Sequence, residues 1–116
     1  MTTPGARAEA LAAEYLMRQG LAIVARNFRT RFGEIDLIAR DGRTLVFVEV
    51  RMRRSTGYGG AAESITPRKR ARLVAAANGY LALLGREPPC RFDAILMDRL
   101  DADAVSWQRD IFADDR

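Results

Sequence analysis

Two acidic residues, Asp36 and Glu49, lie within two apolar stretches that are joined by Asp41-Gly42. An Asp-Gly pair between apolar stretches is typical of a β-hairpin, because its tight turn needs positive φ angles. If this pair forms the centre of the turn, Glu34 lies opposite Glu49, and Asp36 lies diagonal to Glu49 at about 7–8 Å. Two carboxylates at that separation can bind one divalent cation. The spacing therefore predicts a site for Mg²⁺ or Mn²⁺.

The alternation of side chains along a strand predicts one acidic and one apolar face for this hairpin. Like charges that lie opposite one another on a sheet destabilise it. A cluster of acids on one face therefore favours a bound cation, and a simple solvated face is the alternative. The predicted acidic face comprises Glu34, Asp36, Phe47, Glu49 and Arg51, and the apolar face comprises Ile35, Leu37, Val46, Val48 and Val50.

The sequence contains no histidine and one cysteine, Cys90. These counts exclude catalytic triads with histidine, Cys–His pairs, HExxH metal sites, an intrachain disulfide and a multi-cysteine zinc site. Any acid–base or metal chemistry must then come from carboxylates, Lys69, tyrosines or bound water.

The formal net charge is +4, and the basic residues are concentrated in one part of the chain. Residues 51–72 hold seven basic side chains against one acidic, whereas residues 93–116 hold three basic against seven acidic. A basic segment of this kind suits the phosphates of a nucleic acid, and a solvated basic face is the alternative. The candidate nucleic-acid-binding residues are Arg53, Arg54, Arg68, Lys69, Arg70 and Arg72.

The sequence predicts two helices and five strands around these residues, in the order α-β-β-β-α-β-β. Thr66 and Pro67 are typical of a helix N-terminus, and Gly20 and Gly85 are typical of helix ends. This order implies an α/β fold in which helices flank a mixed β-sheet. The expected helices cover residues 5–19 and 67–84, the expected strands 21–29, 33–39, 44–51, 91–98 and 105–111, and a glycine-rich loop 53–66.

The length of 116 residues suits a single domain, residues 1–116. No apolar run approaches the ~20 residues that span a bilayer, and the N-terminal residues do not resemble a secretory signal. We therefore expect a cytoplasmic protein with no membrane partner. The oligomeric state stays open, with a homodimer as one option.

Five stretches of the chain resemble the YraN-like family, small uncharacterised bacterial proteins assigned to the PD-(D/E)XK nuclease superfamily. The central part of the resemblance is Asp36 followed by Glu49-Val50-Arg51 at the end of an apolar strand. The resemblance implies a restriction-endonuclease-like core and Mg²⁺-dependent hydrolysis of phosphodiester bonds. The matching stretches are GARAEALAAEYL (5–16), GEIDLIA (33–39), FVEVR (47–51), PRKRAR (67–72) and RFD (91–93).

The resemblance also implies individual roles. Asp36 and Glu49 would be metal ligands, and the carbonyl of Val50 would be a third. Glu9 matches an acid of the family's first helix and would bind the metal directly or through water. The alternative for Glu9 is an ordinary surface glutamate. Asp93, in a late strand, is instead predicted to be structural or to hold a site residue in place, with Arg91 as its partner.

Arg51 occupies the position at which the superfamily usually has lysine. An arginine keeps its proton in proteins, so Arg51 can orient water and stabilise phosphate charge but cannot act as a base. Lys69, in the first turn of the second helix, is the other candidate for this catalytic position.

Three functions are compatible with these features. The first is a metal-dependent endonuclease that acts on DNA, by resemblance on branched or damaged DNA. The second is a nucleic-acid-binding module that keeps the nuclease fold without turnover. The third is a protein-interaction domain whose acidic C-terminal part binds a basic partner.

Overall fold

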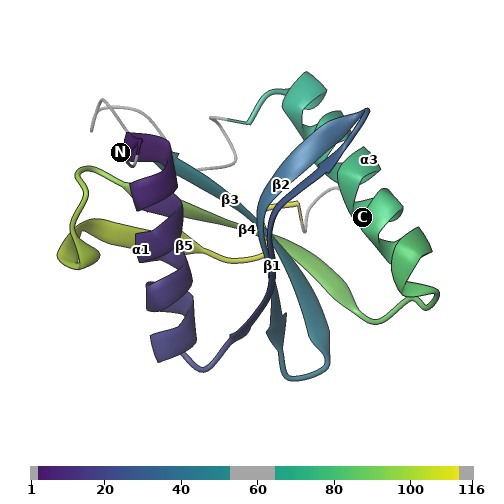
Figure 1. Cartoon of the computed structure of the whole chain (residues 1–116), viewed down its shortest axis with the longest axis horizontal. Helices are drawn as coiled ribbons and strands as arrows, with labels where there is room; N and C mark the ends of the chain where they lie inside the picture. The colour runs from purple at the N-terminus through teal and green to yellow at the C-terminus, as the bar shows by residue number, and fades with distance from the viewer. Residues whose placement is uncertain (1–2, 53–64, 113–116) are drawn as a thin grey trace.

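The computed structural model describes residues 3–52 and 65–112, which form one five-stranded β-sheet between two long helices (Figure 1). The order of elements confirms the predicted order, with one additional short 3₁₀ helix before the last strand. The helices are α1 (Pro4–Arg18), α3 (Pro67–Leu84) and the 3₁₀ helix η1 (Ala102–Ala104). The strands are β1 (Ala22–Thr30), β2 (Gly33–Asp41), β3 (Thr44–Met52), β4 (Cys90–Met97) and β5 (Val105–Gln108).

The sheet is mixed, as predicted, and its strands lie in sequence order from β1 to β5. Strands β3 and β4 are parallel and are connected through α3, whereas the other neighbouring pairs are antiparallel. Strand β3 is therefore the central strand and is covered on both faces. This position explains why its residues 45–48 are consecutively apolar and buried.

Each face of the sheet packs against one helix, and each contact forms its own hydrophobic cluster (Figure 1). On one face, Leu16 of α1 packs with Val46 and Val48 of β3. On the other face, Leu73 of α3 packs with Phe47 of β3. The two faces of β3 thus carry alternate residues, which fixes the direction in which each polar side chain at its end points.

The ends of both helices follow the predicted signals. The hydroxyl of Thr66 accepts a hydrogen bond from the backbone N–H of Lys69, and α3 ends at Gly85 with a left-handed φ of 75°. The hydroxyl of Thr3 caps α1 in the same way, and Gly20 follows the helix with a φ of 95°. These caps fix where α3 begins, and with it the position of Lys69.

The predicted turn of the β2–β3 hairpin is wrong by one position. Asp41 pairs with Thr44, so the two turn residues are Gly42 and Arg43, and of these only Gly42 has a positive φ, 61°. A positive φ at the first turn residue alone is typical of a type II′ turn, which prefers glycine there. The register is shifted accordingly, and Ile38 pairs with Phe47 instead of Leu45.

The predicted alternation along β2 also fails at one residue. Leu37 packs on the α1 side of the sheet, as its neighbour Ala39 does, but Ile35 packs on the α3 side. The alternation is therefore interrupted at Asp36, which lies between them. The single acidic face expected for the hairpin does not form, because both faces of its apolar part are covered by helices.

The last strand is shorter than predicted and ends at Gln108. Asp110 adopts a positive φ of 54°, which ends the extended conformation, and the N–H of Ile111 then donates to the carbonyl of Phe92. Within the described residues, no helix is both long and apolar enough to cross a membrane.

Asp93 is the one charged side chain among the described residues that is completely buried. Its carboxylate accepts hydrogen bonds from Nε of Arg91 (3.1 Å), Nε1 of Trp107 (3.0 Å) and the N–H of Asp110 (2.9 Å). Arg91 in turn donates to Asp41 at 3.0 Å. This network joins β4 to the β2–β3 turn and to the chain after β5, in agreement with the predicted structural role.

We predict that Asp93→Ala destabilises the protein by about 3–5 kcal/mol, because it leaves the half-buried Arg91 and the indole N–H without their partner. Urea unfolding measures the change. Glu87→Ala, which removes an exposed acid, is the control and changes stability by less than about 0.5 kcal/mol. Equal stability of the two variants would contradict the structural role.

Gly33, the first residue of β2, lies against the backbone of α3. A Cβ atom at this position would lie 2.5 Å from the carbonyl oxygen of Arg72. We predict that Gly33→Ala costs about 1–3 kcal/mol in unfolding free energy, because the strand and helix must move apart. Gly5→Ala is the control, since a Cβ there meets only the Thr3 hydroxyl at 4.0 Å. It should leave stability unchanged or raise it.

Candidate metal and phosphate site

Strands β2 and β3 separate beyond the pair Leu37–Val48, and Asp36 lies at the point of separation. Oδ2 of Asp36 accepts a hydrogen bond from the backbone N–H of Val50 at 2.8 Å. The carboxylate thus accepts the hydrogen bond that a backbone carbonyl of β2 would accept in a regular sheet. This hydrogen bond holds Asp36 beside the end of β3, where Glu49 lies.

The carbonyl of Val50 points toward the same gap. In an extended strand the N–H and C=O groups of one residue point to the same neighbouring strand. Since the N–H of Val50 is bonded to Asp36, its carbonyl oxygen is also directed to the β2 side. Asp36 and Val50 therefore present a carboxylate and a carbonyl to one space, as expected of two oxygen ligands.

The carboxyl of Glu49 holds its proton unusually strongly. Burial, and after it the negative charge of Asp36, raise the pKa of Glu49 from its usual value of 4.5 to about 7. The positive charges of Arg51 and Lys69 act against this rise. At neutral pH the site is therefore poised between one and two negative charges, and a bound cation would favour the doubly charged form.

Asp36 shows a similar but smaller effect. Burial raises the pKa of Asp36, while its hydrogen bond from Val50 and the charges of Arg51 and Lys69 lower it. The two carboxylates thus repel one another inside a partly buried space. This repulsion indicates a location suited to a cation.

Glu9 of α1 lies close enough to these acids to be affected by them. Burial raises the pKa of Glu9, and the charge of Asp36 adds to this effect, whereas the side chain of Asn27 lowers the pKa. Glu9 is half-buried on α1, and its role as a metal ligand stays a prediction. Asn27 was not predicted; its φ of 50° within a strand is a conformation that asparagine adopts readily.

Arg51 and Lys69 are the two cations that act on both carboxylates. Both side chains are partly buried, and Nη1 of Arg51 has no hydrogen-bond partner among the described residues although it is shielded from solvent. A buried guanidinium N–H without a partner is costly unless an anion arrives to accept from it. The two predicted catalytic cations therefore do lie beside the two predicted metal ligands.

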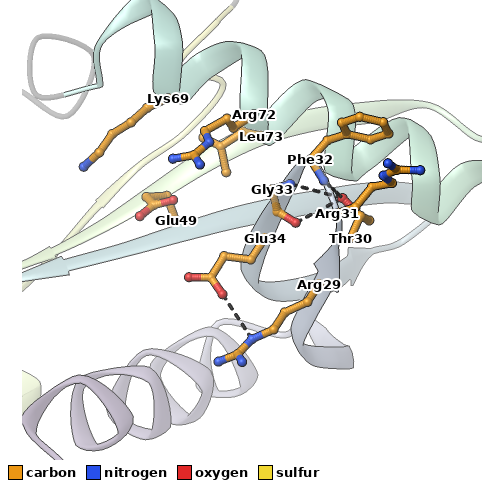
Figure 2. Close-up of a pocket in the computed structure, with 10 residues that line it drawn as sticks. All are labelled: Arg29, Thr30, Arg31, Phe32, Gly33, Glu34, Glu49, Lys69, Arg72 and Leu73. Atoms are coloured by element: carbon orange, nitrogen blue, oxygen red, sulfur yellow. Dashed lines mark hydrogen bonds and ion pairs between the residues drawn. The ribbon is translucent and has the colours of Figure 1, made fainter.

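A pocket of about 430 Å³ opens next to Glu49 and is lined mainly by charged residues (Figure 2). Glu49 and Lys69 lie at one end of it, and the turn between β1 and β2 forms the other end (Figure 2). Glu34 is exposed and pairs with Arg29 at 3.1 Å. The lining residues are Arg29, Thr30, Arg31, Phe32, Gly33, Glu34, Glu49, Lys69, Arg72 and Leu73.

The predicted basic cluster on α3 is divided between two sides of the helix. Lys69 and Arg72 line the pocket beside Glu49. Arg70 instead lies over the ring of Phe112 at 5.0 Å and lines a separate hollow. Arg68 is exposed and lines neither. The predicted contacts at Arg53 and Arg54 lie outside the described residues.

Three residues of the pocket were missed in the sequence, namely Arg29, Arg31 and Phe32. All three lie in or next to the β1–β2 turn. The signal that could have identified them is an aromatic side chain between arginine and glycine in a turn, where no core contact is expected.

Asp36, Glu49 and the Val50 carbonyl are the oxygen donors that fit a hard divalent cation, and the charge of Asp36 also acts on Glu9. Within residues 3–52 and 65–112, no three acidic or cysteine side chains form a ready-made set of metal ligands. A metal at this place would therefore depend on two carboxylates, the carbonyl and water. Mg²⁺ commonly binds in this way, through one or two carboxylates and several waters.

Comparison with known proteins agrees with the family resemblance in the sequence. The model of the uncharacterised protein family UPF0102 matches residues 8–97. A UPF0102 protein of Methylobacillus flagellatus is 53% identical over 109 residues, covering 94% of this chain and 96% of that protein. A UPF0102 protein of Cupriavidus taiwanensis is 54% identical over 110 residues (93% and 81% covered). One of Nitrosospira multiformis is 50% identical over 108 residues (93% and 91%).

We predict that Glu49 makes the stability of the metal-free protein fall as pH rises. The pKa of Glu49 is about 7 in the folded chain and near 4.5 when unfolded, so protonation favours the folded state. This contribution is complete below the unfolded value and is lost as pH rises through about 7. Urea unfolding at about pH 5 and about pH 8 should show the fall in wild type and in the control Glu14→Gln. A fall of the same size in Glu49→Gln would contradict the assignment.

Proposed function

This chain belongs to the UPF0102 family, and we propose that it is a metal-dependent endonuclease that hydrolyses phosphodiester bonds in DNA. The metal is Mg²⁺ or Mn²⁺, bound by Asp36 and Glu49. By this proposal the chain is a member of the PD-(D/E)XK nuclease superfamily. It would act in the cytoplasm, which also suits a chain whose single cysteine has no disulfide partner.

One observation carries this proposal: two partly buried carboxylates and two cations meet at the end of β3. The hydrogen bond from Val50 to Asp36 brings the acids together, and the charges of Arg51 and Lys69 act on both of them. A purely structural ion-pair network would pair these charges directly. The only ion pair formed by residues of this region within the described chain joins Arg29 to Glu34. The remaining charges are thus available to a ligand that carries both signs, such as a metal–phosphate complex.

Each residue has a definite task in this proposal. A metal ion held by Asp36 and Glu49 supplies Lewis-acid stabilisation of the phosphate and lowers the pKa of water. Arg51 keeps its charge at all relevant pH values and can donate two hydrogen bonds to phosphate oxygens. Lys69 lies in the first turn of α3, where the positive end of the helix dipole also favours a phosphate.

DNA is the proposed substrate because the pocket beside Glu49 is lined by cations. The lining contains more basic than acidic side chains, namely Arg29, Arg31, Lys69 and Arg72 compared with Glu34 and Glu49. Phosphate contacts of this kind give affinity without reading the base sequence. The family resemblance adds branched or damaged DNA as the preferred form.

A non-catalytic nucleic-acid-binding module is the second candidate, and one observation favours it. Arg51 stands where the superfamily has lysine, and its buried Nη1 lacks a partner among the described residues. Such a group is suited to holding a phosphate, but it cannot accept a proton from water. Binding would then persist without cleavage.

We predict that Asp36→Asn and Glu49→Gln each weaken Mg²⁺ or Mn²⁺ binding at least about tenfold and reduce DNA cleavage by at least about 10²-fold. Calorimetry measures metal binding, and gel analysis of flap, junction and single-stranded substrates measures cleavage. Glu14→Gln, an exposed acid on α1, is the control and keeps both properties.

The outcomes separate the two candidates. Metal-dependent cleavage that is lost in both site variants supports the nuclease. Binding that weakens with salt and persists in all variants, without cleavage by wild type, supports the binding module. No heat of metal binding by wild type would contradict the nuclease.

A further inference from the structure

Phe32 is an aromatic side chain that the fold leaves exposed to solvent. It is 63% exposed at the turn between β1 and β2. Every other aromatic ring of the described residues contacts another ring within the core or at its edge. A single exposed apolar residue is common in proteins, so exposure alone carries no function. Three further features distinguish Phe32.

The first feature is that the turn is held firmly. The hydroxyl of Thr30 accepts hydrogen bonds from the N–H groups of Phe32 (3.1 Å) and Gly33 (3.2 Å), and it donates to the carbonyl of Gly33 (3.1 Å). Gly33 lies directly against the Arg72 carbonyl of α3. Phe32 is therefore presented from a fixed support, which reduces the entropy that a ligand must overcome.

The second feature is the neighbour of the ring. The guanidinium carbon of Arg31 lies over the Phe32 ring, 5.3 Å from its centroid. This cation–π contact orients the ring and covers part of one face. With 63% of the residue exposed, the ring still offers a broad apolar surface to a flat partner.

The third feature is the location. Phe32 and Arg31 line the same pocket as Glu49, Lys69 and Arg72 (Figure 2). The aromatic ring forms one end of this pocket, and the carboxylate and the lysine lie at the other (Figure 2). A ligand that fills the pocket meets an aromatic surface, several cations and the carboxylate site in succession.

A nucleotide has this combination of groups, namely a flat base, a phosphate and the metal-binding oxygens of that phosphate. A base inside a duplex has both faces covered by its neighbours, so only an unpaired, unstacked base can lie against a protein ring. Base–aromatic stacking is tolerant of sequence because every base has a flat π-surface.

We propose that Phe32 is a base-stacking residue and that the substrate class is nucleic acid with an unpaired nucleotide beside the scissile phosphate. This inference rests on the proposed nuclease function. Phe32 favours a substrate with an unpaired nucleotide over a regular duplex. Arg31 holds the ring and contacts the adjacent phosphate.

The test compares the binding of two probes, an oligothymidylate single strand and a blunt duplex of mixed sequence, by fluorescence anisotropy with Ca²⁺ in place of Mg²⁺. The variants are Phe32→Ala, Phe32→Leu and Phe32→Trp. Leu83→Ala is the control, because Leu83 is also highly exposed but does not line the pocket. Circular dichroism confirms that each variant is folded.

Wild type should bind the single strand more tightly than the duplex. Phe32→Ala and Phe32→Leu should each weaken single-strand binding by about 10- to 100-fold and duplex binding by less than about threefold. Phe32→Trp should retain single-strand binding, since it keeps a π-surface, and Leu83→Ala should behave as wild type.

Two results would overturn the proposal in distinguishable ways. If wild type binds nucleic acid but Phe32→Ala binds the single strand equally well, the stacking role is wrong and the nuclease proposal stands. If wild type binds neither probe, the stacking role is wrong, and the cleavage assay on flap and junction substrates decides the nuclease proposal. Retained binding by Phe32→Leu would also reject stacking, because leucine supplies apolar surface without a π-surface.

Discussion

The hydrogen bond from the N–H of Val50 to the Asp36 carboxylate determines where the chemistry of this chain can occur. Up to Leu37–Val48, β2 and β3 are joined by a regular ladder, and beyond it a side chain replaces the backbone as acceptor. The alternation of β2 is interrupted at the same residue, and the bond holds this acid beside the end of β3. The helices supply the rest, since α1 brings Glu9 near the acids and the capped start of α3 brings Lys69.

This arrangement opposes stability in the absence of a ligand. Two acids share a partly buried space. Burial raises the pKa of both, and the charge of Asp36 helps to raise that of Glu49 to about 7. A structure that only needed to fold would replace such a pair with apolar side chains. The fully paired Asp93 shows the contrast, because its three donors compensate its burial. The Asp93 carboxylate on β4 is thus compensated by hydrogen bonds, whereas the carboxyls of Asp36 and Glu49 have raised pKa values near the end of β3.

Much of this was predictable from local signals. The helix caps at Thr66 and Gly85 and the order of the elements follow from short-range rules. The hairpin register was wrong because Asp-Gly is compatible with more than one turn, and Gly42 occupies the first central position. The irregularity at Asp36 depends on a contact with β3, 14 residues away, which no local pattern contains. Phe32 was missed because a lone aromatic in a turn has no periodicity.

The close contact of Gly33 with the Arg72 carbonyl gives the pocket walls a fixed spacing. The β1–β2 turn that carries Phe32 and the helix that carries Lys69 are in contact through backbone, without a flexible side chain between them. This direct contact resists a change in the spacing of the two walls. A strand that bends easily therefore enters the pocket at a lower energetic cost than a stiff one.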